Sequence, residues 1–455
     1  LLAEIAAQLL ESQGHQVERR FGMGGTLICY QALVNDEIDL YMEYTGTLSQ
    51  VILDLGREAE LNELNDLLAS RSLAIGPPLG FNNTYAMVVK RSVAEARKLF
   101  NLADLNLHPD LKVVVSHEFL ERADGWPGLA ATYGLAGTPT GIEHGLAYQA
   151  LDEGVIDVTD AYSTDGELER YDLVTLTDDQ NYFPVYLAVP LVRADLPEEV
   201  TTLLASLENS IDDQQMSALN YQVVFNKRSF ADVASEFLAS RGVHTEIARY
   251  PIVDELIRNT IQHLKLTSIA LLAAVLVGVG LSLAIFRRPG LSRAVTYICG
   301  LMQTIPSIAL LALMIPIFGI GALPAIIALF LYSLLPILRN TVTALTTIDP
   351  TLTRVGVAIG LTQLEQLKYV YVPLSLPSML AGIRTAAVIS IGTATLAAFI
   401  GAGGLGDPIV TGLSLNDMNL VLRGALPAAA LAVLTELLFE AIEHKLLPGH
   451  LRLTT

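Results

Sequence analysis

The sequence predicts a protein of two domains: an α/β domain over residues 1–250 and an all-α transmembrane domain over residues 251–455 with about five spans. Charge and hydropathy predict this division. The residues before Pro251 hold 16 basic and 38 acidic side chains, a net charge of −22. From Pro251 onward Leu, Ala, Ile, Val and Gly dominate, and 12 basic and 9 acidic side chains give a net charge of +3. An apolar, slightly basic half is typical of a membrane domain.

The acidic half alternates short β-branched runs with helical patterns. This alternation favours an α/β arrangement with mainly parallel sheets. Its charge argues against binding to nucleic acid or to an anionic membrane surface, because both need clustered Lys and Arg. The predicted strands are 86–90, 112–117, 155–162 and 186–192, and the predicted helices are 1–14, 194–217 and 229–241.

The chain opens at Leu1 directly into an apolar pattern of helical spacing, LLAEIAAQLLESQG. We therefore expect a first strand, and any export signal, to precede this numbering. The two cysteines, Cys29 and Cys299, lie one in each half, so neither a metal site nor a disulfide between them is expected. The histidines, including His117 and His144, lack partners at metal-ligand spacing, and we expect them at the surface or at helix caps.

Five apolar stretches in the second half are long enough to cross a bilayer. The first has no charged residue between Lys265 and Arg287. Arg and Lys cluster after the first span, between the third and fourth spans, and after the fifth, so these three regions are expected in the cytoplasm. Five spans then place the acidic half outside the cytoplasm, in a bacterial inner-membrane protein. The expected spans are 264–286, 296–319, 322–346, 378–400 and 425–446.

A polar stretch between the third and fourth spans, residues 347–377, is expected to form a helix–turn–helix. Gly360 is the expected turn residue, and Pro373 and Pro377 are expected to end the second short helix. This stretch resembles the coupling loop of ATP-driven importer permeases: Gly360, Val370 and Pro373 keep its spacing, whereas Arg354-Val355-Gly356 replaces its usual Glu-Ala-Ala.

Three neighbouring segments resemble permeases of the osmoprotectant (glycine betaine, choline and carnitine) ABC importer family. They are TIPSIALLALMIPIFGIG at 304–321, ALFLYSLLPILRNT at 328–341 and GTATLAAFIGAGGLGDPI at 392–409. The resemblance implies a homodimer of the membrane domain, surrounded by membrane lipid, whose coupling loops dock on a cytoplasmic ATP-binding subunit. The resemblance assigns contacts there to Arg354, Gly356, Gly360, Val370 and Pro373. The sequence has no GxxxxGK[ST] loop, so ATP and magnesium are expected on the partner ATPase and no cofactor on this chain.

The acidic half resembles the extracytoplasmic binding proteins of the same family. The similar segments are EIDLYMEYTGT at 37–47, NNTYAMVV at 82–89, and AYSTDG at 161–166 followed by FPVY at 183–186. The resemblance implies a two-lobed, periplasmic-binding-protein-like fold that closes on a small solute. Lobe one would hold about 1–82 and 190–250, and lobe two about 83–189. The closed domain would dock on the membrane domain near 401–419.

The solute class that the resemblance implies carries a quaternary ammonium group, which donates no N–H hydrogen bond and is bound instead by aromatic ring faces. Expected cage members are Tyr44, Tyr85, Tyr162 and Tyr186, with Tyr182 and Phe183 as further candidates. Thr26, Thr47 and Asn83 are the candidates for the polar end of the solute. Asp160 and Asp165 are expected to brace the YSTDG loop.

Several alternatives remain open at this point. Glycine betaine, choline, carnitine and a betaine such as ergothioneine all fit a tyrosine cage. A membrane receptor that binds the solute without transport is a second class, although it needs no coupling loop. An enzyme with a membrane anchor is a third, but the sequence offers no nucleophile–base pair and no cofactor loop.

Overall fold

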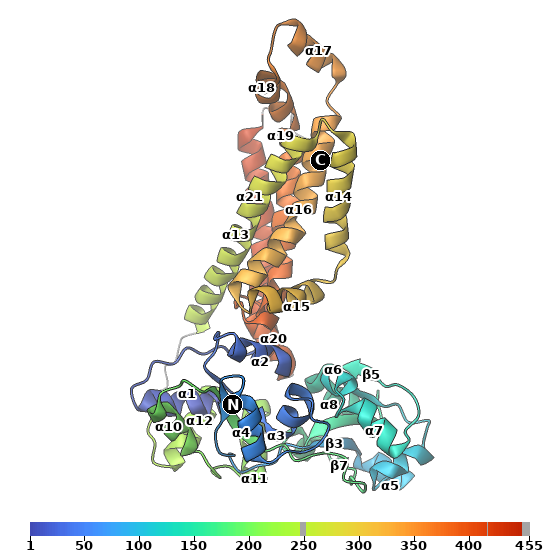
Figure 1. The fold of residues 1–455 in the computed structure, drawn as a ribbon. Helices are drawn as coiled ribbons and strands as arrows, with labels where there is room; N and C mark the ends of the chain where they lie inside the picture. Colours follow the sequence, from blue (N-terminus) through green and yellow to red (C-terminus); the bar gives the residue numbers. More distant parts are fainter. Residues whose placement is uncertain (246–251, 416, 448–455) are drawn as a thin grey trace. The chain divides into compact units, whose positions relative to one another are not determined.

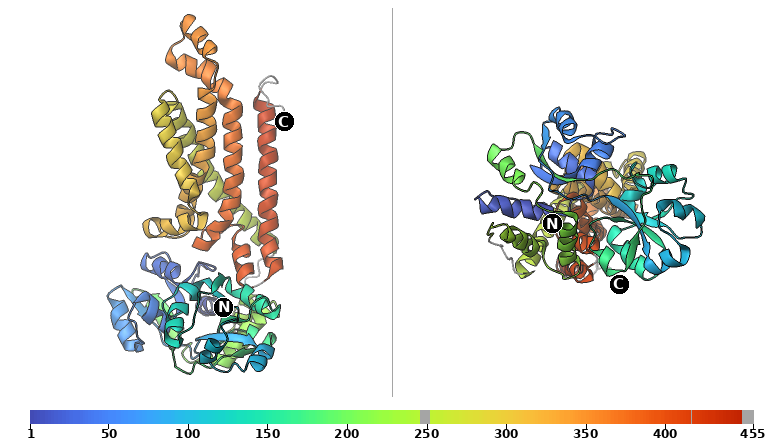
Figure 2. Two further views of the ribbon diagram at one scale, coloured as in Figure 1. Left: turned by 90° about the vertical axis from the view of Figure 1, so that its right-hand side faces the viewer. Right: turned by 90° about the horizontal axis from the view of Figure 1, so that it is seen from below.

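The computed structural model describes residues 1–245, 252–415 and 417–447 (Figure 1, Figure 2). The chain divides into two compact units, Leu1–Arg249 with Gly412–Met418, and Tyr250–Thr411 with Asn419–Thr455. All strands of the described residues belong to the first unit, and the second is built of helices.

The first sheet of the first unit has a returning strand at its centre. Strand β8 (Ala188–Arg193) lies between β1 (Leu40–Tyr44) and β2 (Leu73–Ile75) and is antiparallel to both. Buried Leu73, Val189 and Leu191 pack this sheet against the helices beside it. This sheet is the centre of lobe one.

The second sheet repeats the arrangement. Strand β3 (Tyr85–Lys90) lies between β6 (Val158–Tyr162) and β7 (Leu173–Thr175), again antiparallel to both. A parallel pair, β4 (Val114–Ser116) with β5 (Thr140–Ile142), extends it through a bridge between Val113 and Val158. This sheet is the centre of lobe two.

The expectation of mainly parallel sheets is therefore wrong. The chain enters lobe two through β3 and returns to lobe one through β8. Each of these strands takes the central place in the sheet that it enters, and each runs against both of its neighbours. The β-branched runs predicted four of the eight strands in the described residues, β3, β4, β6 and β8, but carried no information on their pairing.

Helices cover both sheets. The predicted helices 1–14 and 229–241 are confirmed as α1 and α12, whereas 194–217 is two helices, separated where Asn209 adopts a positive φ and Asp212 begins a capping box with Gln215. The helical segments of the first unit are α1 (Leu2–Ser12), α2 (Thr26–Val34), α3 (Thr45–Thr47), η1 (Leu48–Ile52), α4 (Leu61–Ala69), α5 (Arg91–Arg97), η2 (Leu102–Leu107), α6 (His117–Glu121), α7 (Trp126–Tyr133), α8 (His144–Asp152), α9 (Glu167–Arg170), α10 (Glu198–Ala205), α11 (Asp213–Val224) and α12 (Phe230–Ser240).

The second unit contains four helical segments long and apolar enough to span a membrane, or five if one bent pair is counted as a span. These are α13 (Ile252–Ile285), α16 (Ala322–Thr346), the segment Gln363–Ile400, which includes α19 (Val372–Ala394), and α21 (Met418–Leu446). Four of the five predicted spans fall inside these segments. A mainly helical membrane domain is thus confirmed.

The predicted span 296–319 is not one continuous helix. Helices α14 (Pro289–Thr304) and α15 (Ser307–Phe318) meet at an angle of 98°. Pro306 causes the break, because it lacks an N–H and forces Ile305 into extended backbone with φ −69° and ψ 126°. Residues 296–319 form one continuous apolar stretch, so hydropathy alone does not predict the bend.

Small residues let the long helices pack closely. A Cβ atom on Gly278 of α13 would lie 3.0 Å from the Ile337 side chain of α16, and one on Gly382 of α19 would lie 2.8 Å from the carbonyl oxygen of Pro336. Without a hydrophobic driving force between helices in lipid, such close approach is the main source of helix association. Glycine at these two positions therefore permits the helix packing of this unit.

Candidate functional site

A cavity of about 390 Å³ lies between the two lobes of the first unit. Its walls come from the GGT turn before α2, from β1 and α3, from the start of β3, from α6 and from the end of β6. This volume suits a small solute. The lining residues are Gly24, Gly25, Thr26, Cys29, Tyr41, Met42, Glu43, Tyr44, Thr47, Asn83, Tyr85, Glu118, Arg122, Tyr162 and Tyr186.

An aromatic cluster centres on Tyr85. Tyr85 lies opposite Tyr162 in the β3–β6 register, and the two ring centroids are 5.0 Å apart. The Tyr186 ring meets Tyr85 edge-on at 5.6 Å, and Phe119 and Phe183 lie at 4.9 and 6.1 Å. Strand pairing and the return of the chain into β8 thus bring together rings that are distant in sequence.

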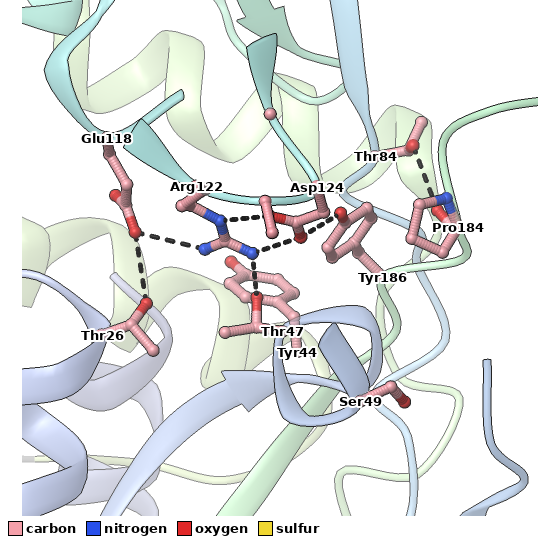
Figure 3. Close-up of polar contacts among 12 residues, drawn as sticks. Thr26, Tyr44, Thr47, Ser49, Thr84, Glu118, Arg122, Asp124, Pro184 and Tyr186 are labelled. Atoms are coloured by element: carbon pink, nitrogen blue, oxygen red, sulfur yellow. Dashed lines mark hydrogen bonds and ion pairs between the residues drawn. The ribbon is translucent and has the colours of Figure 1, made fainter. Parts of the chain in front are cut away.

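Arg122 lies at the centre of a polar network in the same cavity (Figure 3). It makes two hydrogen bonds to Asp124, at 2.8 and 2.6 Å, and one to Glu118 at 3.2 Å. It also donates to the Thr47 hydroxyl at 3.3 Å, and its guanidinium carbon lies 5.6 Å from the Tyr85 ring centroid. A cation in this cavity therefore already contacts the aromatic cluster.

Asp124 connects this network to the returning strand, because its Oδ2 accepts a hydrogen bond from the Tyr186 hydroxyl at 2.7 Å. Burial alone would raise the pKa of Asp124, but hydrogen bonds from Arg122 and Tyr186 and the Arg122 charge hold that pKa below its usual value. The Thr26 hydroxyl donates to Glu118 at 3.3 Å, so both lobes contribute to the network.

A second polar cluster supports Tyr162 on the lobe-two side. The Asp165 carboxylate accepts the Tyr162 backbone N–H at 2.9 Å, lies 2.9 Å from His144 Nε2, and accepts the Tyr148 hydroxyl. The His144 ring centroid lies 4.9 Å from that of Tyr162. Burial opposes a charged His144, but the carboxylates of Asp165 and Asp160 raise its pKa well above the usual value.

This arrangement corrects one expectation and confirms another. His144 is not only a surface or cap residue, because its imidazole is held between two carboxylates. Asp165 braces the YSTDG loop as expected. Asp160, expected to do the same, instead accepts hydrogen bonds from the backbone N–H and the hydroxyl of Ser116. Among the residues that the structure describes, no group of three or more His, Cys, Asp or Glu side chains could hold a metal ion.

The 347–377 segment of the second unit is a helical hairpin (Figure 1). Helix α17 (Pro350–Ala358) ends at Gly360, whose φ of +87° confirms it as the turn residue. The chain continues through α18 (Gln363–Gln366) and a π-helical turn, η3 (Leu367–Tyr371), directly into α19.

Pro373 and Pro377 do not end the second short helix, so that expectation is wrong. Pro373 stands in the first turn of α19, where no N–H is needed, and Pro377 lies inside α19. The π-helical turn just before them gives the backbone a wider geometry at this point. The hairpin is consequently joined rigidly to a long helix.

One contact packs the two arms of the hairpin on each other, and another joins the hairpin to the end of α13. A Cβ atom on Gly356 would lie 3.5 Å from Gln366 and 4.0 Å from Val370, so α17 packs closely on the second arm. Arg287, after the end of α13, donates to Gln363 at 2.8 Å and lies over the Tyr371 ring at 5.6 Å. The Arg354 side chain on α17 is exposed.

Comparisons with known proteins cover nearly the whole chain. Residues 1–240 match the family described as the substrate binding domain of ABC-type glycine betaine transport systems. Residues 252–448 match the inner membrane component of binding-protein-dependent transport systems. The chain belongs to the ABC-type glycine betaine transport family. It is a binding domain and a permease in one polypeptide, a fused component of an osmoprotectant importer.

Curated relatives of the importer's membrane half are permeases. The glycine betaine/carnitine/choline permease OpuCB of Bacillus subtilis is 42% identical over 198 residues, which are 44% of this chain and 91% of that protein. The choline permease OpuBB of the same organism is 43% identical over 195 residues, 43% of this chain and 90% of that protein. The osmoprotectant permease OsmW of Salmonella typhimurium is 44% identical over 198 residues, 42% of this chain and 92% of that protein.

Solved structures resemble the importer's binding half. A glycine betaine/carnitine/choline ABC transporter crystal structure is 27% identical with a TM-score of 0.43 and covers 53% of this chain and 95% of its own. Apo YehZ from Escherichia coli is 29% identical with a TM-score of 0.42 and covers 53% of this chain and 94% of its own.

Seven of the nine residues predicted to bind solute line this cavity: Thr26, Tyr44, Thr47, Asn83, Tyr85, Tyr162 and Tyr186. Tyr182 and Phe183 are not among the lining residues, and the Tyr182 hydroxyl donates instead to the carbonyl oxygens of Ala123 and Gly125. Phe183 packs against Tyr85 behind the wall. That these side chains contact solute remains a prediction for this importer.

The charged residues of the cavity were not predicted from the sequence: Glu43, Glu118 and Arg122, with Asp124 bonded to Arg122. Glu43 is the first residue of the EYTGT segment, so its position in the sequence did offer a signal. Arg122 and Asp124 lie in HEFLERADG, which looks like an ordinary charged helix and turn. Only the fold shows that this stretch faces the cavity.

Proposed function

We propose that the binding domain of this importer subunit closes on a quaternary-ammonium solute of the glycine betaine, choline or carnitine class. The observation that carries the proposal is the convergence of Tyr44, Tyr85, Tyr162 and Tyr186 on one small cavity. A trimethylammonium group is bound by ring faces, and each contact contributes about 0.5–2 kcal/mol. Four such contacts sum to about 2–8 kcal/mol, and the upper end of this range approaches the roughly 8 kcal/mol of micromolar binding.

The polar network of the cavity suits the other end of such a solute. Arg122 and Thr47 come from opposite lobes and are already hydrogen bonded to each other. A solute carboxylate or hydroxyl that replaces this contact would link both lobes through itself. Solute binding would thereby favour the closed arrangement of the lobes, as ligand-driven domain closure requires.

Transport would use the permease half and a separate ATPase. In this proposal the binding domain lies outside the cytoplasm and the 347–377 hairpin inside it. The hairpin carries exposed apolar side chains on α17 and the following turn, including Val355, Val357 and Ile359. Exposed apolar residues of this kind mark a protein contact. The proposed partner is a cytoplasmic ATP-binding subunit that holds ATP and magnesium.

In the same proposal two permease domains pair in the lipid bilayer, and Arg354, Gly356, Gly360, Val370 and Pro373 belong to the coupling surface. Fusion raises the effective concentration of each binding domain at its permease, because docking becomes intramolecular. No catalytic step is assigned to this chain.

The test is calorimetric titration of the full chain in lipid nanodiscs with glycine betaine, choline, carnitine, ergothioneine and proline. We expect micromolar binding of one or more of the first three, weakened in Tyr85→Ala. Tyr182→Phe is the matched control, since it alters a tyrosine outside the cavity lining and should bind as the wild type does. Binding of ergothioneine alone would change the solute, and silence toward all quaternary ammonium compounds would overturn the cage.

A further inference from the structure

Glu43 is a buried carboxylate that the aromatic cage does not explain. It stands on β1, directly before Tyr44, and lines the cavity. Only 3% of its surface is exposed. Burying a carboxylate is costly unless its charge is compensated, so its position in a binding cavity calls for a reason.

Among the residues that the structure describes, the hydrogen-bond donors to this carboxylate are neutral groups. Glu43 Oε1 accepts the backbone N–H of Tyr44 at 2.8 Å, and Oε2 accepts the Tyr41 hydroxyl at 3.0 Å. Within the described part of the chain, no Lys or Arg nitrogen lies within 4 Å of it. Its nearest charge compensation is therefore long-range, in contrast to that of Asp124, which is paired directly with Arg122.

The groups around Glu43 place its pKa close to neutral pH. Burial raises its pKa to about 7, its two hydrogen bonds and the Arg122 charge oppose that rise, and the Glu118 charge adds to it. The titratable and charged groups that interact with it from the neighbouring elements are Cys29 of α2, Tyr41 and Tyr44 of β1, Glu118 of α6, and Arg122.

We propose that Glu43 determines whether the cavity prefers a net cationic quaternary-ammonium solute or a zwitterionic one, and that it releases its proton when the cationic solute binds. The inference rests on the proposed function. Ionised Glu43 attracts a cation such as choline. It repels the carboxylate of a zwitterion such as glycine betaine, whose other partner in the cavity is Arg122.

The proton balance is simple. Protonated Glu43 and a cationic solute give a carboxylate–cation pair, and one proton passes to the buffer. A zwitterion brings its own negative charge, so it offers Glu43 no net stabilisation of the ionised form. The affinity for choline should therefore rise with pH through neutrality, while that for glycine betaine should stay level or fall.

The experiment compares choline and glycine betaine on the full chain in nanodiscs at about pH 5.5, 7 and 8.5. We expect the ratio of choline affinity to glycine betaine affinity to rise about tenfold over this range, since the carboxylate passes from mostly protonated to mostly ionised. Because both solutes share the cage, effects of pH on the rings cancel in the ratio. Titration in two buffers of different ionisation enthalpy should also show proton release with choline.

Glu43→Gln keeps the shape and should flatten the ratio, and Glu118→Gln, which removes a different carboxylate of the cavity, should keep its rise. Tyr41→Phe removes one hydrogen bond from the carboxylate and should move the rise to higher pH. A ratio independent of pH in the wild type, or a rise retained in Glu43→Gln, would overturn the inference while leaving the proposed function intact. Failure of both solutes to bind at any pH would overturn both.

Discussion

Tyr85 and Tyr162 occupy opposite positions of the β3–β6 pair, and their ring centroids lie 5.0 Å apart. Tyr85 is the first residue of its strand and Tyr162 the last of its own, so the pair stands at the edge of the sheet that borders the cavity. Behind Tyr162 the Asp165 carboxylate accepts that residue's backbone N–H. The strand pairing and this hydrogen bond together hold the Tyr85 and Tyr162 rings in place.

Tyr162 is expected to bind solute through its ring and not its hydroxyl. Tyr162→Phe should keep the affinity for choline within about threefold, whereas Tyr162→Leu should lower it by about 3- to 30-fold, the equivalent of one cation–π contact. Calorimetric titration of both variants measures the difference. Equal losses in the two variants would assign the contact to the hydroxyl instead.

Arg122 is expected to separate solutes by their polar end. Arg122→Gln should weaken glycine betaine and carnitine by about tenfold or more, because a charge-assisted hydrogen bond to the carboxylate is lost. Choline, which has no carboxylate, should lose less. Competition titrations on the same preparation give the comparison, and a uniform loss for all three solutes would mean that Arg122 acts only by holding the lobes together.

His144 is expected to stabilise the binding domain in a pH-dependent way. Its pKa is raised in the folded state, so its contribution is fully present below the unfolded value of about 6.5 and is lost as the pH rises through the folded pKa. His144→Gln should therefore lower the unfolding temperature most below about pH 6.5. The single tryptophan, Trp126, is buried in this domain, so its fluorescence follows unfolding of this domain. A deficit that grows with rising pH would contradict the assignment.

Gly356 is expected to set the spacing of the hairpin arms. A Cβ there meets only ordinary contacts at 3.5 Å or more, so Gly356→Ala should be tolerated. Gly356→Leu should push α17 away from Val370. With the partner ATPase present, the Leu variant should lose most solute-stimulated ATP hydrolysis and keep solute binding, and the Ala variant is its matched control. Full activity in Gly356→Leu would show that the arm spacing is not required.

Arg287 is expected to connect the first span to the hairpin. Its side chain joins the end of α13 to the hairpin by a hydrogen bond to Gln363 and by a cation–π contact with the Tyr371 ring. Arg287→Ala should reduce transport per ATP hydrolysed without changing solute affinity, because the hairpin would move without α13. Arg293→Ala is the control, because Arg293 donates a hydrogen bond to the carbonyl oxygen of Pro289 within its own helix, α14. An unchanged transport-to-hydrolysis ratio in Arg287→Ala would remove this residue from the coupling path.

The sequence predicted the parts of this protein that depend on short segments. Strand positions follow β-branched runs, spans follow hydropathy, and the cavity tyrosines follow recognisable strings such as EYTGT and YSTDG. Each of these signals lies within a few residues, where periodicity and motif are informative. The same holds for Gly360, whose turn follows from its missing side chain.

What escaped prediction depends on contacts between distant segments. Arg122 lies in a stretch that looks solvated, and only the packing of α6 beside the cavity brings this side chain to the cavity wall. The central, antiparallel places of β3 and β8 depend on where the chain crosses between lobes. The bend at Pro306 depends on one residue within an otherwise continuous apolar run.

The central position of both crossing strands limits how the lobes can move. Since β3 and β8 are hydrogen bonded on both sides, we expect rotation of the lobes to be concentrated in the few residues at 82–84 and 184–187, just before these strands. These two stretches are joined by hydrogen bonds from Thr84 to Pro184 and from the Tyr186 N–H to Asn82. Two crossing strands joined in this way should act as one hinge, so one distance measured between two spin labels, one on each lobe, should report whether the domain is open or closed.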